Sequence, residues 1–199
     1  MFKKRLDELT CVLDKCTYTT SKEVINANEA LEMAHFLLYQ VAKVEGIIYV
    51  VGNGGSAGIA SHFCTDLLRT LEMSAATFSD SNIITCFAND FGYENVYKLP
   101  LMRNLRSRDL LVAISSSGSS LNIIEAAKIA HERKVPVMSL TGFSPHNPLR
   151  RLGDLNFWLD SHDYGLVESG HFFLLHTIID ACKTKSVTKS ETCALSALS

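Results

Sequence analysis

Four short apolar runs, the first of them rich in β-branched residues, constrain the fold of this 199-residue chain most strongly. They are GIIYVV (46–51), LLVAI (110–114), VPVMSL (135–140) and LNFWL (155–159). Runs of this kind are typical of strands that are buried on both faces. Because segments with helical spacing lie between them, the pattern predicts an α/β fold: a three-layer αβα sandwich with a mostly parallel central sheet.

The chain before the first run has helical spacing. Apolar residues recur every three or four positions over 3–18 and 22–44, and Ser21 is a candidate N-cap for the second segment. We therefore expect two N-terminal helices, within residues 1–45, that precede any strand and pack on the domain or on a partner subunit.

The remaining segments complete the predicted order. We expect a second strand at 75–79, a short helix or turn at 82–90 and a closing helix at 165–182. The α/β domain is predicted to span 46–184. The polar, serine-rich stretch 185–199 is predicted to be a disordered tail.

Composition excludes several classes of protein. The net charge is -2 and the pI about 6.4, with no basic stripe, so we expect no direct nucleic-acid binding. No signal-peptide pattern follows the basic N-terminus, and the apolar runs are too short to cross a membrane. Six cysteines without a CxxC pair are typical of reduced thiols, so a cytoplasmic protein is expected.

Glycine-rich residues follow the first strand. The loop GNGGS (52–56) lies directly before a helical segment, where glycines let a ligand approach the main chain and free N–H groups favour an anion. The alternative is a tight turn with Ser56 as N-cap. The loop matches neither the dinucleotide-binding nor the P-loop motif.

Serine residues follow the strand at 110–114. The loop SSSGSS (115–120) offers five hydroxyl groups before another helix, which favours phosphate binding without a lysine. A flexible turn, or Ser120 acting only as a cap, is the alternative. Since ligands bind at the carboxyl ends of strands in open α/β sheets, both loops are candidates for one site.

Two helices carry paired polar residues. His62 and Asp66 are four residues apart and share a helix face, and Glu168 and His176 are eight apart, about 80° around the helix axis. By itself, such a histidine–acid pair is more often a simple hydrogen bond. Its place beyond a ligand-binding loop favours a functional role.

Several stretches together resemble the sugar isomerase (SIS) domain family, nearest its phosphoheptose isomerase branch. They are GNGGSAGIASHF, ANDFGYENVY, LLVAISSSGSSLNIIEAA, LTG and VESGHFFLLH, and the resemblance runs from about residue 20 to 183. It implies a flavodoxin-like SIS fold and the interconversion of sedoheptulose 7-phosphate and D-glycero-D-manno-heptose 7-phosphate through an enediol(ate). It also implies a cytoplasmic homotetramer that supplies heptose for lipopolysaccharide or capsule in bacteria.

The resemblance assigns roles by position. It implies substrate binding by Asn53, Gly54, Gly55, Ser56, Asn89, Asp90, Ser115, Ser116, Ser117, Ser120 and Glu168. It implies a Zn²⁺ site, or one for another divalent metal, at His62, Asp66, Glu168 and His176. Asp66 takes the position of the catalytic base and His176 that of the acid.

Three positions depart from the family pattern. Asp66 stands where the family has glutamate, Glu168 where it has glutamine, and Ser119 where it has asparagine. An aspartate carboxylate lies about 1.5 Å further back, and a displacement of that size can cost about a hundredfold in rate. These departures leave two alternatives open. One is a non-catalytic module that binds sugar phosphates or a protein such as the replication initiator. The other is an isomerase of another phosphosugar.

Overall fold

In the computed structural model, the backbone is described for residues 1–196 and the side chains for residues 1–184. The centre is a seven-stranded sheet with the order β2-β1-β7-β6-β5-β3-β4. Strands β3 to β7 run parallel, and β1 and β2 are antiparallel additions at one edge. The strands are β1 (Thr17–Thr20), β2 (Val24–Ile25), β3 (Ile48–Gly52), β4 (Ala75–Ala76), β5 (Leu110–Ser115), β6 (Val137–Thr141) and β7 (Leu155–Trp158).

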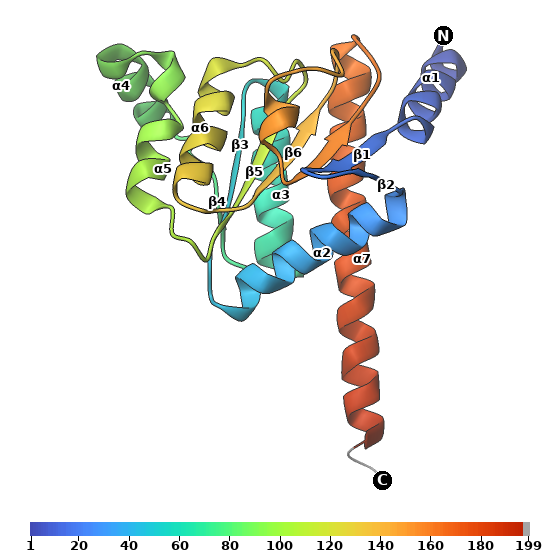
Figure 1. Ribbon diagram of the computed structural model, residues 1–199. Coiled ribbons are helices and arrows are strands. Elements are labelled where there is room, and N and C mark those ends of the chain that lie inside the picture. The colour runs from blue at the N-terminus through green and yellow to red at the C-terminus, as the bar shows by residue number, and fades with distance from the viewer. Residues whose placement is uncertain (197–199) are drawn as a thin grey trace.

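Helices cover both faces of the sheet, so the predicted three-layer α/β fold is confirmed (Figure 1). One face carries α1 (Phe2–Asp14), α2 (Ala27–Lys43), α3 (Gly55–Thr70) and α7 (Tyr164–Ser196). The other carries α4 (Ser81–Phe91), α5 (Lys98–Asn104) and α6 (Leu121–Glu132), with the 3₁₀ segments η1 (Tyr93–Asn95) and η2 (Leu149–Leu152).

The four apolar runs of the sequence form the central strands. Every residue of β3, β5, β6 and β7 is buried, as expected for strands that are covered on both sides. Alternate residues enter different cores. In β5, Val112 packs with Phe63 of α3 on one face, whereas Leu111 packs with Leu101 of α5 on the other.

The prediction of two N-terminal helices without an intervening strand was wrong. Residues 17–20 form β1, which pairs antiparallel with β7 along its whole length. The β-branched threonines of this segment suit a strand. Helix α2 accordingly begins later, and its N-cap is Asn26 in place of Ser21: Asn26 and Glu29 form a reciprocal capping box.

Smaller expectations agree with the structure. The strand predicted at 75–79 is confirmed but short, and the helix at 82–90 is confirmed. Pro100 lies in the first turn of α5, where its missing N–H has no intrahelical acceptor in any case. The predicted disorder of 185–199 falls on residues whose side chains lie outside the described part of the chain, so it stays a prediction.

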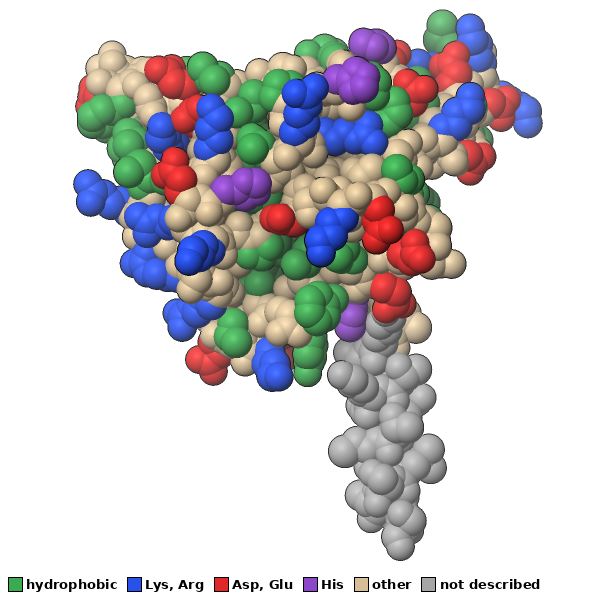
Figure 2. Space-filling model, viewed as in Figure 1, with side chains coloured by type: hydrophobic (Ala, Val, Ile, Leu, Met, Phe, Trp, Pro, Cys, Tyr) green, Lys and Arg blue, Asp and Glu red, His purple; other side chains and the backbone are tan. Residues whose placement is uncertain are grey.

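Charged side chains and cysteines have different places in the structure. Acidic and basic side chains are interspersed over the face shown in Figure 2. Among residues 1–184, none of the five cysteines forms a disulfide, and Cys16, Cys64 and Cys182 are buried. Burial raises the pKa of the Cys16 thiol to about 11, so it behaves as a core hydrophobe. Within the described residues, no helix has the length and apolar character that crossing a membrane requires.

Candidate functional site

The glycine-rich and serine-rich loops open onto one cavity of about 230 Å³. This follows from the sheet, because β3 and β5 are parallel neighbours and their carboxyl ends lie side by side. The cavity is lined by Asn53, Gly54, Gly55, Ser56, Ile114, Ser115, Ser116, Ser117, Ser120, Tyr164 and Glu168. Most of the predicted substrate-binding residues therefore meet in one place.

The glycine-rich loop delivers the N-terminus of α3 to this cavity. Gly54 is the N-cap residue, has a left-handed φ of +53° and provides no side-chain cap. The first-turn amides of α3 therefore lack a capping side chain and are oriented for an anion. Beneath the loop, the Tyr97 hydroxyl donates to the Gly52 carbonyl, and burial raises the pKa of Tyr97 to about 12, so the donor keeps its proton.

An asparagine pair ties the two loops together. Asn53 Nδ2 donates to Asn122 Oδ1 over 2.9 Å, and Asn122 Nδ2 donates back to Asn53 Oδ1 over 2.8 Å. The Tyr93 hydroxyl adds a third bond to Asn53 Oδ1 at 3.2 Å. Sequence reasoning missed Asn122 and Tyr93. The one signal for Asn122 was its place in the first turn of the helix that follows the serine loop.

The serine-rich loop holds its hydroxyl groups in defined positions. Ser115 Oγ accepts from the Gly118 amide and lies 3.3 Å from Ser120 Oγ. Ser116 is 5% exposed, and its Oγ has no hydrogen-bond partner in the described structure. A buried hydroxyl without a partner is costly, so Ser116 Oγ marks a place where a polar ligand atom belongs.

Glu168 of α7 lines the same cavity and lies against the glycine-rich loop. Its carboxylate packs directly on Gly55, so closely that a methyl group at that position would clash with it. A negative charge at a helix N-terminus is stabilised by the helix dipole. Of the described residues that line the cavity, Glu168 carries the one formal charge.

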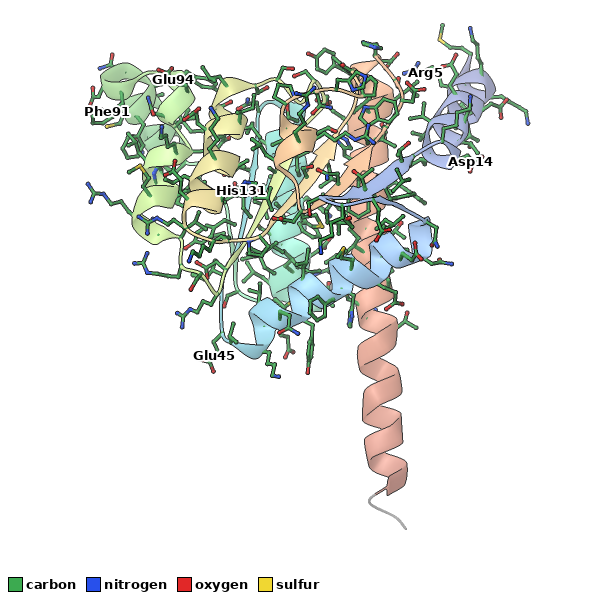
Figure 3. All side chains as sticks on the ribbon, in the orientation of Figure 1. Arg5, Asp14, Glu45, Phe91, Glu94 and His131 are labelled. Atoms are coloured by element: carbon green, nitrogen blue, oxygen red, sulfur yellow. The ribbon has the colours of Figure 1, made fainter. Side chains whose placement is uncertain are left out.

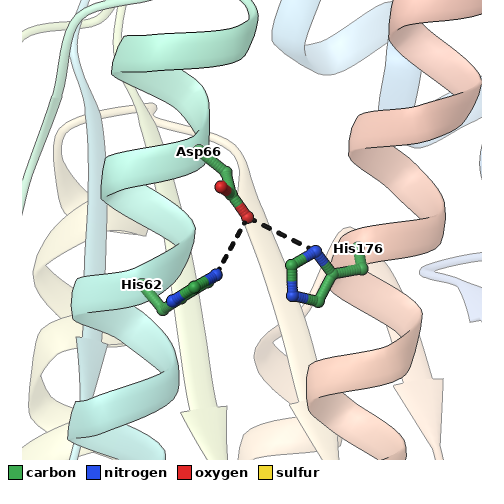
Figure 4. A group of neighbouring side chains, drawn as sticks. All are labelled: His62, Asp66 and His176. Carbon is green, nitrogen blue, oxygen red and sulfur yellow. Dashed lines mark ion pairs between the residues drawn. The ribbon is translucent and has the colours of Figure 1, made fainter.

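A second group of polar side chains lies further along the α3–α7 seam (Figure 4). Asp66 Oδ2 is 3.3 Å from His62 Nε2 and 3.4 Å from His176 Nδ1. The Asp66 side chain is 8% exposed, whereas the two histidines are 48% and 42% exposed. Asp66 thus reaches both imidazoles despite being one methylene shorter than glutamate. Arg69 Nη2 is 3.7 Å from its other oxygen.

These three residues are suited to a divalent metal. Their potential ligand atoms lie within 4.8 Å of one another, and two imidazoles with one carboxylate are a donor set that zinc prefers. Glu168 does not belong to this group. The predicted four-residue set is therefore divided: three members meet, and the fourth faces the loop cavity.

Aromatic packing supports the histidines. The Phe172 ring lies edge-on to His62 and His176, with centroids 4.9 and 4.5 Å away. Sequence reasoning missed Phe172 because an apolar residue on a helix gives no signal that separates it from core.

Asn89 and Asp90 are not brought to the cavity within one chain. They lie exposed near the end of α4 and bond to each other, Asn89 Nδ2 donating to Asp90 Oδ1 over 2.8 Å. Figure 3 shows the neighbouring Phe91 at the outer corner of the molecule.

Three histidines outside these two groups have different surroundings. His171 is fully buried, its Nε2 is 3.1 Å from the Thr141 carbonyl, and burial lowers its pKa to about 4. His131 lies 3.8 Å from Asp154, and His162 stacks on Phe143.

Comparison with known proteins defines the class. The family model of the SIS domain matches residues 13–142, so the chain belongs to the SIS domain family. Its similar relatives include the phosphoheptose isomerase of Campylobacter concisus, which is 33% identical over 168 residues, covering 81% of this chain and 88% of the relative. A phosphoheptose isomerase of Neisseria meningitidis serogroup C is 35% identical over 152 residues, or 72% of this chain and 77% of that protein.

Solved structures agree. The structure of phosphoheptose isomerase GmhA from Neisseria gonorrhoeae matches with a TM-score of 0.77 at 29% identity, over 92% of this chain and 99% of that one. The Vibrio vulnificus NanR protein, complexed with ManNAc-6P, shares the fold, with a TM-score of 0.69 at 21% identity over 96% of this chain and 64% of NanR.

Proposed function

We propose that this chain is a phosphoheptose isomerase that interconverts sedoheptulose 7-phosphate and D-glycero-D-manno-heptose 7-phosphate. The observation that carries the proposal is the shared cavity with the buried, unpartnered Ser116 hydroxyl, together with the His62–Asp66–His176 group further along α3 and α7. The phosphate binds to the serine hydroxyls and to the amides at the start of α3.

The spacing of the two groups suits a long sugar. His62 and Asp66 follow Ser56 in α3 by six and ten residues, which is about 9 and 15 Å along a helix. Six C–C bonds of about 1.5 Å in a zigzag give a seven-carbon chain a length of about 8 Å, and the phosphate ester extends it further. With its phosphate at the serine loop, such a sugar brings its carbonyl end to the histidines.

The chemistry is a proton transfer between neighbouring carbons. Asp66 removes the proton from the carbon beside the carbonyl, and the electron pair of that C–H bond forms the double bond of the enediol(ate). His176 gives a proton to the carbonyl oxygen. Asp66 then gives the proton to the former carbonyl carbon. The hydroxyl group on the carbon that lost its hydrogen gives its own proton to His176 as the new C=O bond forms, and the isomeric sugar results.

The donor set of the described residues fits a metal. His62, Asp66 and His176 would hold Zn²⁺ or another divalent ion. A bound cation supplies Lewis acidity at an oxygen. In the absence of an ion, the same three side chains hold one another by the contacts in Figure 4.

The setting of this activity is also a proposal. We place the enzyme in the cytoplasm, where it supplies heptose for a bacterial lipopolysaccharide, capsule or similar surface glycan. The non-catalytic alternative, a sugar-phosphate sensor or protein-binding module, is not favoured, because the relatives at 30 to 35% identity are phosphoheptose isomerases.

We further propose that the chain forms a homotetramer. Large apolar side chains are exposed on three helices of one face: Met33 and Phe36 on α2, Leu68 on α3, and Phe173 on α7. Apolar surface of this kind is typical of subunit contacts. A neighbouring subunit would also cover the half-exposed histidines.

Solvent-exchange NMR tests the activity. The purified chain is incubated with sedoheptulose 7-phosphate in D₂O, with and without added zinc. We expect the aldose product and deuterium on the carbons that exchange protons. Unphosphorylated sedoheptulose is the control and should turn over far more slowly. Absence of both product and deuterium under all conditions would refute the proposal.

A further inference from the structure

We propose that Tyr164 is a phosphate-binding residue, whose hydroxyl donates a hydrogen bond to the phosphate held by the serine loop. The inference rests on the proposed function and extends it to a residue that the motifs do not include. Its basis is the position of Tyr164 in the cavity wall and the way neighbouring residues hold that position.

Tyr164 lies at the phosphate end of the cavity. It is the first residue of α7 and lines the cavity together with Ser115, Ser116 and Glu168. Glu168 follows one turn later on the same face, and His176 about 18 Å along the helix. Tyr164 is therefore on the side away from the histidines, where the phosphate binds and the reacting carbons do not.

Charge considerations call for a further donor. A phosphate carries up to two negative charges, yet none of the described residues that line the cavity is lysine or arginine, and Glu168 is acidic. Neutral O–H and N–H groups must therefore supply the hydrogen bonds. Tyr164 is 60% exposed and lines the cavity, so a ligand there can reach its side chain.

One aromatic neighbour packs against the Tyr164 ring. Phe143 lies edge-on to Tyr164, with centroids 4.8 Å apart, and stacks on His162 at 5.2 Å. Phe143 has a φ of +55°, a left-handed conformation that is costly for a phenylalanine. Retained strain of this kind clusters at ligand sites.

The backbone around Tyr164 is tied to the serine loop and to α1. Gly142, next to Phe143, donates its N–H to the Ser116 carbonyl over 2.9 Å. Asp163 caps α7 by accepting from the Leu166 amide, and Arg5 of α1 donates to both of its oxygens over 3.0 and 3.1 Å. Tyr164 is thus held in fixed relation to the serine hydroxyls.

The substitution Tyr164→Phe tests the proposal, because it keeps the ring and removes the hydroxyl. We expect the KM for sedoheptulose 7-phosphate to rise about tenfold or more, with kcat within about twofold, since a hydrogen bond to a charged group is lost far from the reacting carbons. The control is Tyr39→Phe on α2, outside the cavity, which should leave both constants unchanged.

Inorganic phosphate separates this inference from the proposed function. Phosphate that binds the folded chain raises its Tm in a concentration-dependent way. We expect the apparent Kd for phosphate from that titration to rise about tenfold in Tyr164→Phe, even if the wild-type chain isomerises no sugar. Equal phosphate affinity of the variant and the wild type would overturn the role of Tyr164, whatever the activity.

Discussion

Asp66 is the residue at which the shorter side chain matters most. Its carboxylate faces His62 and His176 at 3.3 and 3.4 Å, so the backbone of α3 and the packing of α7 compensate for the missing methylene. A close contact with both imidazoles is what a base beside an acid requires.

We expect Asp66→Asn to lower kcat by about 10²–10⁴, because the amide cannot accept the carbon-bound proton. Asp66→Glu, which restores the side chain of the family pattern, should retain activity within about tenfold. Steady-state rates and the Tm of each variant check this. An active Asp66→Asn enzyme would remove Asp66 from the proposed mechanism.

His171 makes stability depend on pH. Burial lowers its pKa from 6.5 to about 4, so between these values the unfolded chain binds more protons than the folded chain. The contribution of His171 is therefore complete above pH 6.5 and declines as the pH falls toward 4. The largest change in the free energy of unfolding is about 3 kcal/mol, because a pKa shift of one unit corresponds to about 1.36 kcal/mol.

Denaturant unfolding at several pH values tests this contribution. His171→Gln keeps a donor for the Thr141 carbonyl but does not titrate. We expect the stability gap between wild type and variant to narrow from pH 7 to pH 4.5. Parallel curves for the two proteins would show that His171 is not the titrating group.

The serine-rich loop is the element whose shape depends on one glycine. Gly118 has a φ of +63°, and any Cβ there would clash with the side-chain amide of Asn147. The loop is further fixed by the bond from the Leu149 amide to the Gly118 carbonyl, at 3.0 Å. A change at Gly118 therefore moves the hydroxyl groups as well as the backbone.

We expect Gly118→Ala to lower the free energy of unfolding by about 1–2 kcal/mol or more and to raise the KM for the sugar phosphate. Gly58→Ala is a matched control. Gly58 lies within α3 with open space around it, so alanine should stabilise the helix by about 0.5–1 kcal/mol. If Gly118→Ala and Gly58→Ala had similar effects on KM, the shape of the serine-rich loop would not be what determines substrate binding.

The whole molecule presents apolar side chains beside a half-exposed site. Phe173 is 55% and Leu68 53% exposed, on the same two helices that carry the histidines and Asp66. Burial of these side chains by neighbouring subunits would remove water from the site and strengthen its electrostatic interactions.

Substitution of Phe173→Asp should therefore shift the wild-type assembly to smaller species in sedimentation velocity, because it places a charge in an apolar contact. Phe2→Asp is the control, since Phe2 is 82% exposed at the start of α1. A wild-type chain that sediments as a monomer at micromolar concentration would contradict the proposed tetramer.

Local sequence patterns were sufficient for much of the fold and part of the site. The buried strands, the two loops at their carboxyl ends and the pairing of His62 with Asp66 follow from periodicities of two and 3.6 residues, which the chain carries in itself. That β3 and β5 are neighbours then places both loops at one cavity.

Contacts between distant segments were decided by tertiary structure alone. The pairing of β1 with β7 and the bond between Asn53 and Asn122 join residues far apart in sequence, and no local period encodes such a partner. Glu168 shows the same limit. Helical spacing gives it nearly the same face as His176, but eight residues also separate the two by about 12 Å along the axis. The packing of α7 against α3 therefore sends His176 to Asp66 and Glu168 to Gly55.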